Sequence, residues 1–305
     1  MFVRWAQEWN LACDECSPTT MIGGYVARYG LVRQQPPLQV RAEAFSSRTK
    51  GGQMTESSRI YRFLKQDIVT CTLKPGLSIS EKEMCERYKA SRTPVREACR
   101  KLCGESLMEM IPFRGYSLTP LTMKEYRNLN EIQVIVEPAA AALAAQRATE
   151  EQIREIESWA SYEYHDGQKS SYYTFLEWNR NFHISIAAST RNDAFLEVVR
   201  NVQTRLMRYY YLVIVMDSYG KELIEEHQRL VRAIKAGDEK MARMYALEHL
   251  TNTHRRSTDI DLRSMSMDLT TAFDDNGHLA PHSVVPRTKA LKRKPETRRA
   301  ALLRR

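Results

Sequence analysis

The chain has 305 residues, 43% of them hydrophobic, and a formal net charge of +9 at pH 7. This length is enough for two ordinary domains, each with its own core. The sequence has no run of 18 apolar residues and no signal-peptide layout at its N-terminus, which argues against a membrane-spanning or secreted protein and predicts a cytoplasmic one.

The positive charge is distributed unevenly along the chain. Residues 287–305 contain nine Lys/Arg and one Glu, residues 54–120 contain twelve Lys/Arg and eight Asp/Glu, and residues 121–286 carry a net charge of −5. A mildly basic module followed by an acidic one fits one domain that binds an anion and another with a different task. Most of the excess charge lies in the C-terminal segment, so the total by itself does not identify a DNA-binding protein.

The six cysteines do not form the disulfide framework of a secreted protein. Cys99 and Cys103 are four residues apart on one predicted helix and are expected to pack. Cys13 and Cys16 form a lone CxxC pair with no second pair at zinc-finger spacing, so a metal or redox role is not favoured for them.

Residues 1–53 show no sustained periodicity, whereas a helical pattern begins just after Met54. Residues 50–53 are of a type that a purine-rich stretch before a start codon would encode. Our hypothesis is that translation starts at Met54 and that residues 1–53 are a misassigned extension; the alternative is a disordered N-terminal arm. The intact mass of the native protein distinguishes the two, since a mass that includes residues 1–53 rules out the first.

The segment from Ser58 to Lys89 predicts two helices. The Pro75-Gly76 pair predicts a turn between them. Ser80 is expected to cap the second helix, with Glu83 completing a capping box. The first helix is indicated by apolar residues at helical spacing, namely Ile60, Phe63, Leu64 and Ile68.

A third helix is predicted to begin at the cap Ser91, only a short turn after the second, which is the layout of a helix-turn-helix. Residues 107–111 and 116–118 then predict two strands joined at Arg114-Gly115. Residues 54–120 therefore predict a winged helix-turn-helix domain, with three helices and a small hairpin wing.

The third helix carries the residue types that contact DNA. Arg92, Arg96 and Arg100 are four residues apart and share one face, and the positive N-terminal end of the helix favours phosphates. The alternative is a charged face that is merely solvated. Val95 is placed on the apolar side with Ala98, Cys99 and Leu102, yet it also belongs to the residues predicted to contact DNA, which are Ser91, Arg92, Thr93, Val95, Arg96, Arg100, Arg114 and Gly115.

Residues 121–260 have long helical periodicities, few glycines and one proline, Pro138. The breaks between the periodic segments predict an all-α bundle of about six helices. Residues 261–305 lose the periodicity and end in a Lys/Arg run, so they are predicted to form a disordered basic tail.

The motifs occur in the order of a known family. LKPGLSIS, SRTPVREACRKL and PFRGYSLTPL cover residues 57–120, and VEPAAAALAAQRATEEQI, NRNFHISIA and EHQRLVRAIKAGD cover much of residues 122–255. This pattern resembles the GntR family of bacterial transcriptional regulators, in its FadR-type subgroup with the helical FCD effector domain. The resemblance implies a homodimer on a palindromic operator in the bacterial cytoplasm and nucleoid, more often a repressor than an activator, that senses a small molecule such as an organic acid.

Three histidines and one asparagine are candidates for a metal site. Asn179 and His183 are four apart on one predicted helix, His227 faces inward among leucines, and His249 lies on the last helix. The subgroup often has Asp where this chain has Asn179. Three imidazoles and an amide oxygen suit Zn²⁺ or Ni²⁺. The open alternatives are histidines that bind an acidic effector without metal, and histidines that simply pack in the core.

Four further residues are candidates for the effector pocket. Gln133 stands where the subgroup often has Arg, which argues against one type of carboxylate clamp. Arg205, Arg208 and Tyr209 form a cationic and aromatic cluster that either lines the pocket or packs the bundle. Outside the pocket, Ser106 stands where a glycine is usual between the third helix and the wing.

These patterns favour a ligand-responsive transcriptional regulator that is not an enzyme. One rival is a metal-dependent hydrolase that uses the histidines, but neither HExxH nor GxSxG occurs. A second rival is a non-specific nucleic-acid-binding protein driven by the basic tail, which deletion of residues 261–305 would test.

Overall fold

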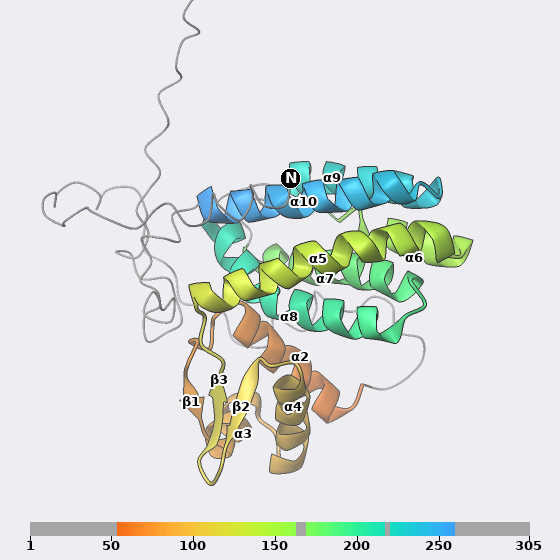
Figure 1. The fold of residues 1–305 in the computed structure, drawn as a ribbon. Helices are drawn as coiled ribbons and strands as arrows, with labels where there is room; N and C mark the ends of the chain where they lie inside the picture. The colour runs from red at the N-terminus through yellow and green to blue at the C-terminus, as the bar shows by residue number, and fades with distance from the viewer. Residues whose placement is uncertain (1–53, 163–168, 217–219, 260–305) are drawn as a thin grey trace, which may run out of the picture. The chain divides into compact units, whose positions relative to one another are not determined.

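The computed structural model of the chain describes residues 54–162, 169–216 and 220–259. The predictions made for residues 1–53 and 261–305, including the CxxC pair and the basic tail, lie outside these described residues. Within them the fold is mainly helical with one small sheet, as predicted (Figure 1).

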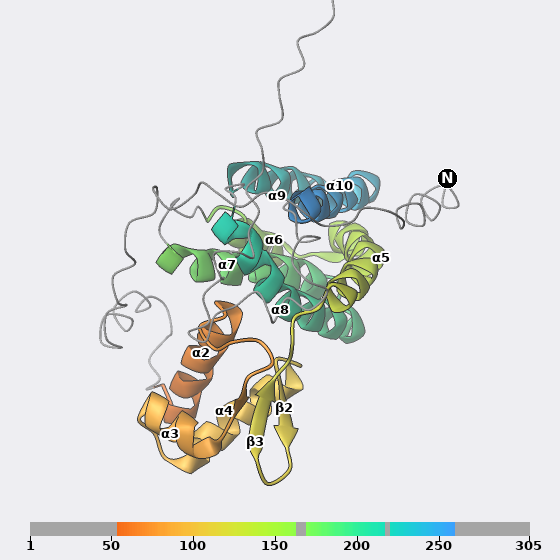
Figure 2. The same cartoon turned by 90° about the vertical axis from the view of Figure 1, so that its left-hand side faces the viewer.

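The N-terminal part of the described chain is a winged helix-turn-helix. Its elements are α2 (Glu56–Val69), β1 (Ser78–Ile79), α3 (Glu81–Tyr88), α4 (Arg92–Gly104), β2 (Met108–Ile111) and β3 (Gly115–Leu118). The predicted hairpin is confirmed, and Figure 2 shows it beside α4. The sheet has a third strand that the sequence did not predict, since β1 is only two residues long; the strand order is β1-β3-β2, antiparallel throughout.

Local chemistry accounts for the ends and bends of these elements. Ser80 and Glu83 form the predicted capping box. Ser106 has φ 56°, a left-handed conformation that explains why glycine suits this bend. Gly115 has φ 113°, and a Cβ there would lie 2.5 Å from the carbonyl oxygen of Ile79, so the pairing of β1 with β3 requires glycine.

The core of the winged helix joins all three of its helices. The buried side chains come from one face of each helix and from the sheet, and they include Ile60, Leu64, Ile68, Met84, Tyr88, Val95, Ala98, Cys99, Leu102 and Leu118. Burial of this apolar face, at roughly 25 cal/mol per Å², is what fixes α3 and α4 relative to α2.

The second part of the described chain is a helical bundle. It contains α5 (Met123–Arg147), α6 (Glu150–Trp159), α7 (Lys169–Ser189), α8 (Asp193–Met216), α9 (Gly220–Lys235) and α10 (Glu239–Asp259), so the expectation of about six helices is confirmed. The central helix α5 packs against α7, α8, α9 and α10. None of the described helices is long and apolar enough to span a membrane.

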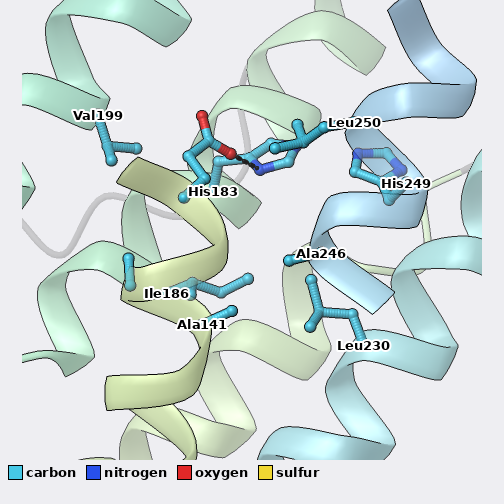
Figure 3. A pocket seen from close by; sticks show the side chains of 10 residues that line it. Ala141, His183, Ile186, Val199, Leu230, Ala246, His249 and Leu250 are labelled. Atoms are coloured by element: carbon cyan, nitrogen blue, oxygen red, sulfur yellow. Dashed lines mark ion pairs between the residues drawn. The ribbon is translucent and has the colours of Figure 1, made fainter. Parts of the chain in front are cut away.

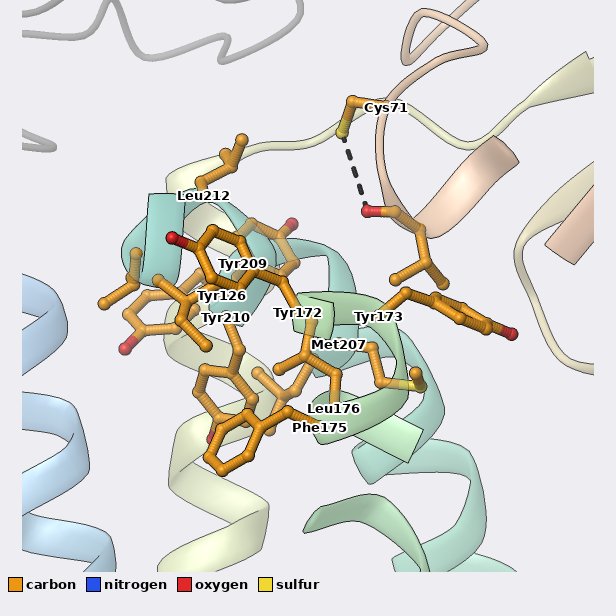
Figure 4. Close-up of a cluster of buried hydrophobic side chains, with 14 of the residues drawn as sticks. Cys71, Tyr126, Tyr172, Tyr173, Phe175, Leu176, Met207, Tyr209, Tyr210 and Leu212 are labelled. Atoms are coloured by element: carbon orange, nitrogen blue, oxygen red, sulfur yellow. Dashed lines mark hydrogen bonds between the residues drawn. The ribbon is translucent and has the colours of Figure 1, made fainter. Parts of the chain in front are cut away.

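The bundle has two apolar clusters. One is aromatic and contains Tyr126, Tyr172, Phe175, Tyr209 and Tyr210 (Figure 4). The other is aliphatic and joins α5, α6, α7, α9 and α10. Each helix therefore presents an apolar face to the interior, and the polar side chains that are buried among these faces need specific partners.

Candidate functional site

A short connection sets the position of α4. α3 ends at Tyr88, Lys89 adopts a left-handed conformation with φ 50°, and its N–H donates to the carbonyl oxygen of Cys85. The chain re-enters helix directly after Ser91, which occupies the N-cap position. Two helices joined in this way are the helix-turn-helix arrangement predicted from the sequence.

The N-terminal end of α4 is an exposed and strongly basic surface. The side chains of Ser91, Arg92, Thr93, Arg96 and Arg100 are exposed. The first turn of α4 holds no acidic residue, and the side chain of Ser91 does not cap the helix. Its hydroxyl and the unpaired N–H groups of the first turn therefore remain available to a phosphate.

Val95 corrects the sequence prediction. Its side chain is fully buried in the core beside Ala98, Cys99 and Leu102. It lies three residues after Arg92 and one residue before Arg96, so its side chain leaves the helix in a different direction from theirs and enters the core. Val95 thus supports the DNA-contact surface from below and does not contact DNA through its side chain.

Arg96 is held by a residue of the preceding helix. Its Nε donates to Oε1 of Glu81 at 2.7 Å, so the first residue of α3 is bridged to the second turn of α4. The hydrogen bond and the charge of Arg96 lower the pKa of Glu81, and those of Glu81 raise the pKa of Arg96. A lowered pKa of Glu81 and a raised pKa of Arg96 both mean that the charged forms of the two side chains are favoured.

The tip of the wing is exposed. Phe113 has φ 63° and a fully exposed ring; Arg114 follows it in the turn, and Gly115 is the first residue of β3. The wing therefore presents an aromatic side chain next to the predicted Arg114-Gly115 contact.

In the bundle, the three candidate histidines come together. His183 of α7, His227 of α9 and His249 of α10 are buried, and one ring nitrogen of each lies within 4.8 Å of the other two. The Nε2 atoms of His227 and His249 are 3.3 Å apart. Figure 3 shows His183 and His249 projecting from different helices toward one hollow.

Two carboxylates hold the outer nitrogens of this histidine cluster. Oε2 of Glu137 lies 2.7 Å from Nδ1 of His183, and Oε2 of Glu226 lies 2.9 Å from Nδ1 of His249. With Nδ1 of His183 and Nδ1 of His249 engaged, the Nε2 atoms of these two rings are left for the interior, where Nε2 of His249 meets that of His227. A carboxylate on the outer nitrogen is the usual way in which proteins orient a metal-binding imidazole.

Further hydrogen bonds fix the two carboxylates. Nε2 of Gln203 donates to Glu137 at 2.7 Å, and Arg256 donates to both oxygens of Glu226 at 2.9 Å. Burial raises the pKa of Glu226, but the hydrogen bonds from His249 and Arg256 outweigh it and lower the pKa to about 2. Burial also lowers the pKa of His249. The histidine is thereby kept neutral, as a metal ligand must be.

Asn179 supplies an oxygen without a partner. Its side chain is buried one turn before His183 on α7, and Oδ1 accepts no hydrogen bond within the described part of the chain. An unsatisfied buried oxygen costs about 1–3 kcal/mol. Three buried imidazoles with such an oxygen on the same helix as His183 form a donor set that fits a divalent ion such as Zn²⁺ or Ni²⁺.

A pocket adjoins the histidine cluster on each side. Two small hollows both border His183, His249 and Leu250. The first is otherwise mostly aliphatic. The second is more polar, and its lining includes Gln133, Phe175, Asn179, Tyr210 and Thr253.

Of the four residues predicted to line the effector pocket, Gln133 borders the second hollow, and Arg205, Arg208 and Tyr209 border neither of the two. Arg205 donates to Glu125 at 2.6 Å, Arg208 to the carbonyl oxygen of Thr119 at 2.7 Å, and Tyr209 to Glu125 at 2.9 Å. These hydrogen bonds connect α8 with the first turn of α5 and with the segment that precedes α5. The three side chains point away from the two hollows because α8 turns another face toward α5, where Gln203 donates to Glu137 and Tyr210 donates to Gln133.

The sequence reasoning also missed several residues. Glu81 and Phe113 lie at the DNA-contact surface, and Glu137, Glu226 and Tyr210 lie at the histidine cluster. Two weak signals existed: Glu226 directly precedes His227, and Glu137 is four residues after the noted Gln133. The partners of these residues lie on other helices, so spacing along the chain does not reveal them.

Comparison with known proteins identifies the families of the two domains. The model for bacterial regulatory proteins of the gntR family matches residues 56–117, and the FCD domain model matches residues 128–252. The protein belongs to the GntR family. Its members are transcriptional regulators, so this GntR regulator combines a DNA-binding helix-turn-helix with an effector-binding FCD domain.

Named relatives agree with this assignment. The HTH-type transcriptional repressor RspR of Escherichia coli K12 is 29% identical over 194 residues, which cover 64% of this GntR regulator and 85% of RspR. The galactonate operon transcriptional repressor of the same organism is 25% identical over 228 residues, with 68% and 99% covered.

A solved structure shows the same fold. Escherichia coli McbR/YncC matches with a TM-score of 0.54 and 20% identity, over 68% of this GntR regulator and 99% of that chain. The fold is thus shared at low sequence identity, and the side chains that set specificity must be argued from this chain.

Proposed function

We propose that the protein is a ligand-responsive repressor that binds a palindromic operator as a homodimer in the bacterial cytoplasm. The observation that carries the proposal is the exposed, acid-free first turn of α4 with arginines behind it. Two relatives named as repressors, RspR and the galactonate operon repressor, support the direction of regulation. A two-fold dimer presents two equivalent helices to two half-sites of a palindrome.

In the DNA complex, α4 enters the major groove. Arg92 and Arg96 contact base edges or phosphates, Thr93 and Ser91 bind the backbone from the first turn, and Arg100 extends the cationic face. Arg114 and Gly115 of the wing enter the minor groove, where the Arg114 guanidinium contacts the backbone or base edges.

In the bundle, the histidine cluster binds Zn²⁺ or Ni²⁺. The ligands are the Nε2 atoms of His183, His227 and His249 with Oδ1 of Asn179. The supporting observations are the convergence of three buried imidazoles, the two carboxylates on their outer nitrogens and the partnerless oxygen of Asn179. Bound there, the ion supplies a Lewis-acid centre for an anionic oxygen.

The effector is a small organic acid that enters the polar hollow. With neutral Asn179 in the ligand set, the effector carboxylate provides the anionic donor, and Gln133 and Thr253 offer neutral hydrogen-bonding groups. Effector binding changes operator affinity only to the extent that it favours one arrangement of the dimer over the other.

The protein has no enzymatic role in this proposal. Hydrolysis at a metal requires a nearby base to handle the proton of the attacking water. Both carboxylates that contact the cluster already accept from histidine nitrogens and from Gln203 or Arg256.

Selection of bound sequences from random DNA tests the proposal. We expect enrichment of a two-fold symmetric sequence, with half-sites about one helical turn apart. Enrichment must survive deletion of residues 261–305, because the tail adds only salt-sensitive background binding. Failure to enrich any sequence, with folded dimer and with metal both present and absent, would contradict the proposal.

A further inference from the structure

We propose that Glu81 determines sequence specificity by holding Arg96 in the orientation in which it recognises guanine. The inference rests on the proposed role of Arg96 in DNA binding and adds a second residue that is not itself a base contact. Glu81 lies on α3 and Arg96 on α4, fifteen positions apart, and Oε1 of Glu81 accepts from Nε of Arg96 at 2.7 Å.

Glu81 contacts the Nε atom of Arg96 and leaves the two terminal nitrogens of the guanidinium for DNA. Arginine has five N–H groups in a rigid planar fork, and the Nε–H is the one that Glu81 engages. The two terminal nitrogens remain, and guanine presents a matching pair of acceptors, O6 and N7, in the major groove. Since half of the Arg96 side chain is exposed, its terminal nitrogens are accessible while its Nε edge is fixed.

The contact with Glu81 restricts the rotamers of Arg96 before DNA binds, so less conformational entropy is lost on binding. A long arginine side chain has many rotamers, and ordering it at an interface opposes binding. A preformed ion pair orders the side chain before DNA arrives. The orientation also favours bidentate recognition of a base over attachment to any nearby phosphate.

A purely structural role does not explain the pair as well. α3 and α4 are already joined by the buried side chains of Met84, Tyr88, Val95 and Cys99. An ion pair with exposed fractions of 50% and 25% adds little to such a core. A carboxylate at this surface also repels phosphates, so its presence reduces general affinity for DNA.

The other acidic side chains of α3 have different partners. Glu83 accepts from the N–H and hydroxyl of Ser80 in the capping box, and Glu86 pairs with Lys82 at 3.8 Å one turn away. Glu81 is thus the acidic residue of α3 that contacts the arginine face of α4. Glu86 offers a matched control, because its removal changes the charge of the same helix by the same amount.

The test compares Glu81→Ala, Glu81→Gln and Glu86→Ala on the selected operator, on variants substituted at each base pair and on unrelated DNA, at one salt concentration. We expect Glu81→Ala to lose about tenfold in discrimination at one guanine, while binding to unrelated DNA is unchanged or stronger. Glu81→Gln should retain much of the discrimination, because its amide oxygen still accepts from Nε. Glu86→Ala should keep it fully.

Arg96→Ala identifies the guanine concerned, and Glu81→Ala should have no further effect at that position in an Arg96→Ala background. Equal changes at all sequences in Glu81→Ala and Glu86→Ala, with discrimination intact, would overturn the inference and leave Glu81 as a general repulsive charge. If Arg96→Ala itself leaves every base preference unchanged, the proposed role of Arg96 fails and the inference fails with it. Thermal unfolding of each variant verifies that the domain remains folded.

Discussion

The surface of α4 and the histidine cluster use polar side chains in opposite environments. Arg92, Arg96 and Arg100 are exposed, so their charges act on phosphates through solvent and salt. The three histidines are buried, and burial lowers the pKa of His227 well below its usual value. The first region attracts an anion by net charge, whereas the second offers neutral lone pairs in a fixed geometry.

The comparison shows where each region obtains its selectivity. In the proposed DNA complex, the charge of the α4 arginines gives affinity, and the contact between Glu81 and Arg96 gives selectivity by orienting Arg96. In the bundle, the carboxylates of Glu137 and Glu226 orient the imidazoles of His183 and His249, and these rings are buried away from solvent. Removal of an exposed arginine from the first region should therefore weaken DNA binding without altering the fold, and removal of a histidine from the second should remove most of the metal binding.

The largest effect is expected from His183→Ala. Loss of one of three imidazoles should lower the affinity for Zn²⁺ by more than about 100-fold, because the remaining donors no longer surround the ion. Metal analysis and calorimetric titration of untagged protein measure it. His254→Ala is the control, since His254 lies on the same helix as His249 but stacks on Tyr126. Equal metal content in wild type and His183→Ala would rule out this metal site.

Arg96→Ala should weaken operator binding by about 10- to 100-fold, the range expected for loss of a bidentate base contact. The protein should remain folded, since the side chain is half exposed. Fluorescence anisotropy with operator DNA measures the affinity, and Arg154→Ala on α6 controls for the loss of a surface charge. An unchanged affinity in Arg96→Ala would show that α4 contacts DNA elsewhere.

Asn179→Asp should strengthen metal binding, on the order of tenfold, because a carboxylate replaces a neutral oxygen close to a divalent ion. It should also weaken the response to organic acids, since the site then needs less negative charge from the effector. Titration with Zn²⁺, followed by titration with a panel of small carboxylic acids, measures both. Weaker Zn²⁺ binding in Asn179→Asp would show that Asn179 is not a ligand.

The smallest effect on binding is expected from Val95→Ala. The buried side chain loses two carbon atoms, so the free energy of unfolding should fall by about 2 kcal/mol. Base preference should stay the same, because Val95 does not reach solvent. Denaturant unfolding and sequence selection measure the two effects, and a changed base preference would restore the sequence prediction that Val95 contacts DNA.

The fold was largely predictable because its signals are local. Caps, turns and apolar periodicity lie within a few residues of each other, and the capping box of Ser80 and Glu83 is an example. The strand β1 was missed because two residues are too short for an alternating pattern, and its existence depends on pairing with β3.

The sites were predictable only where one residue type carries the signal. Histidines are few, so the cluster of His183, His227 and His249 was found. The roles of Arg205, Arg208 and Tyr209 were not, because neighbours on α8 differ by about 100° in direction and only tertiary packing decides which face meets the histidines. Partnerships between helices, such as Glu81 with Arg96, have no signature in sequence spacing.

The central claim is that the state of the histidine cluster controls the DNA-contact surface. The most direct test is the operator affinity of wild type and His183→Ala, each loaded with Zn²⁺ and then stripped by a chelator. We predict that removal of the metal changes the affinity of wild type severalfold and leaves His183→Ala unaffected. Identical affinities of wild type in both states, with metal content verified, would contradict the account.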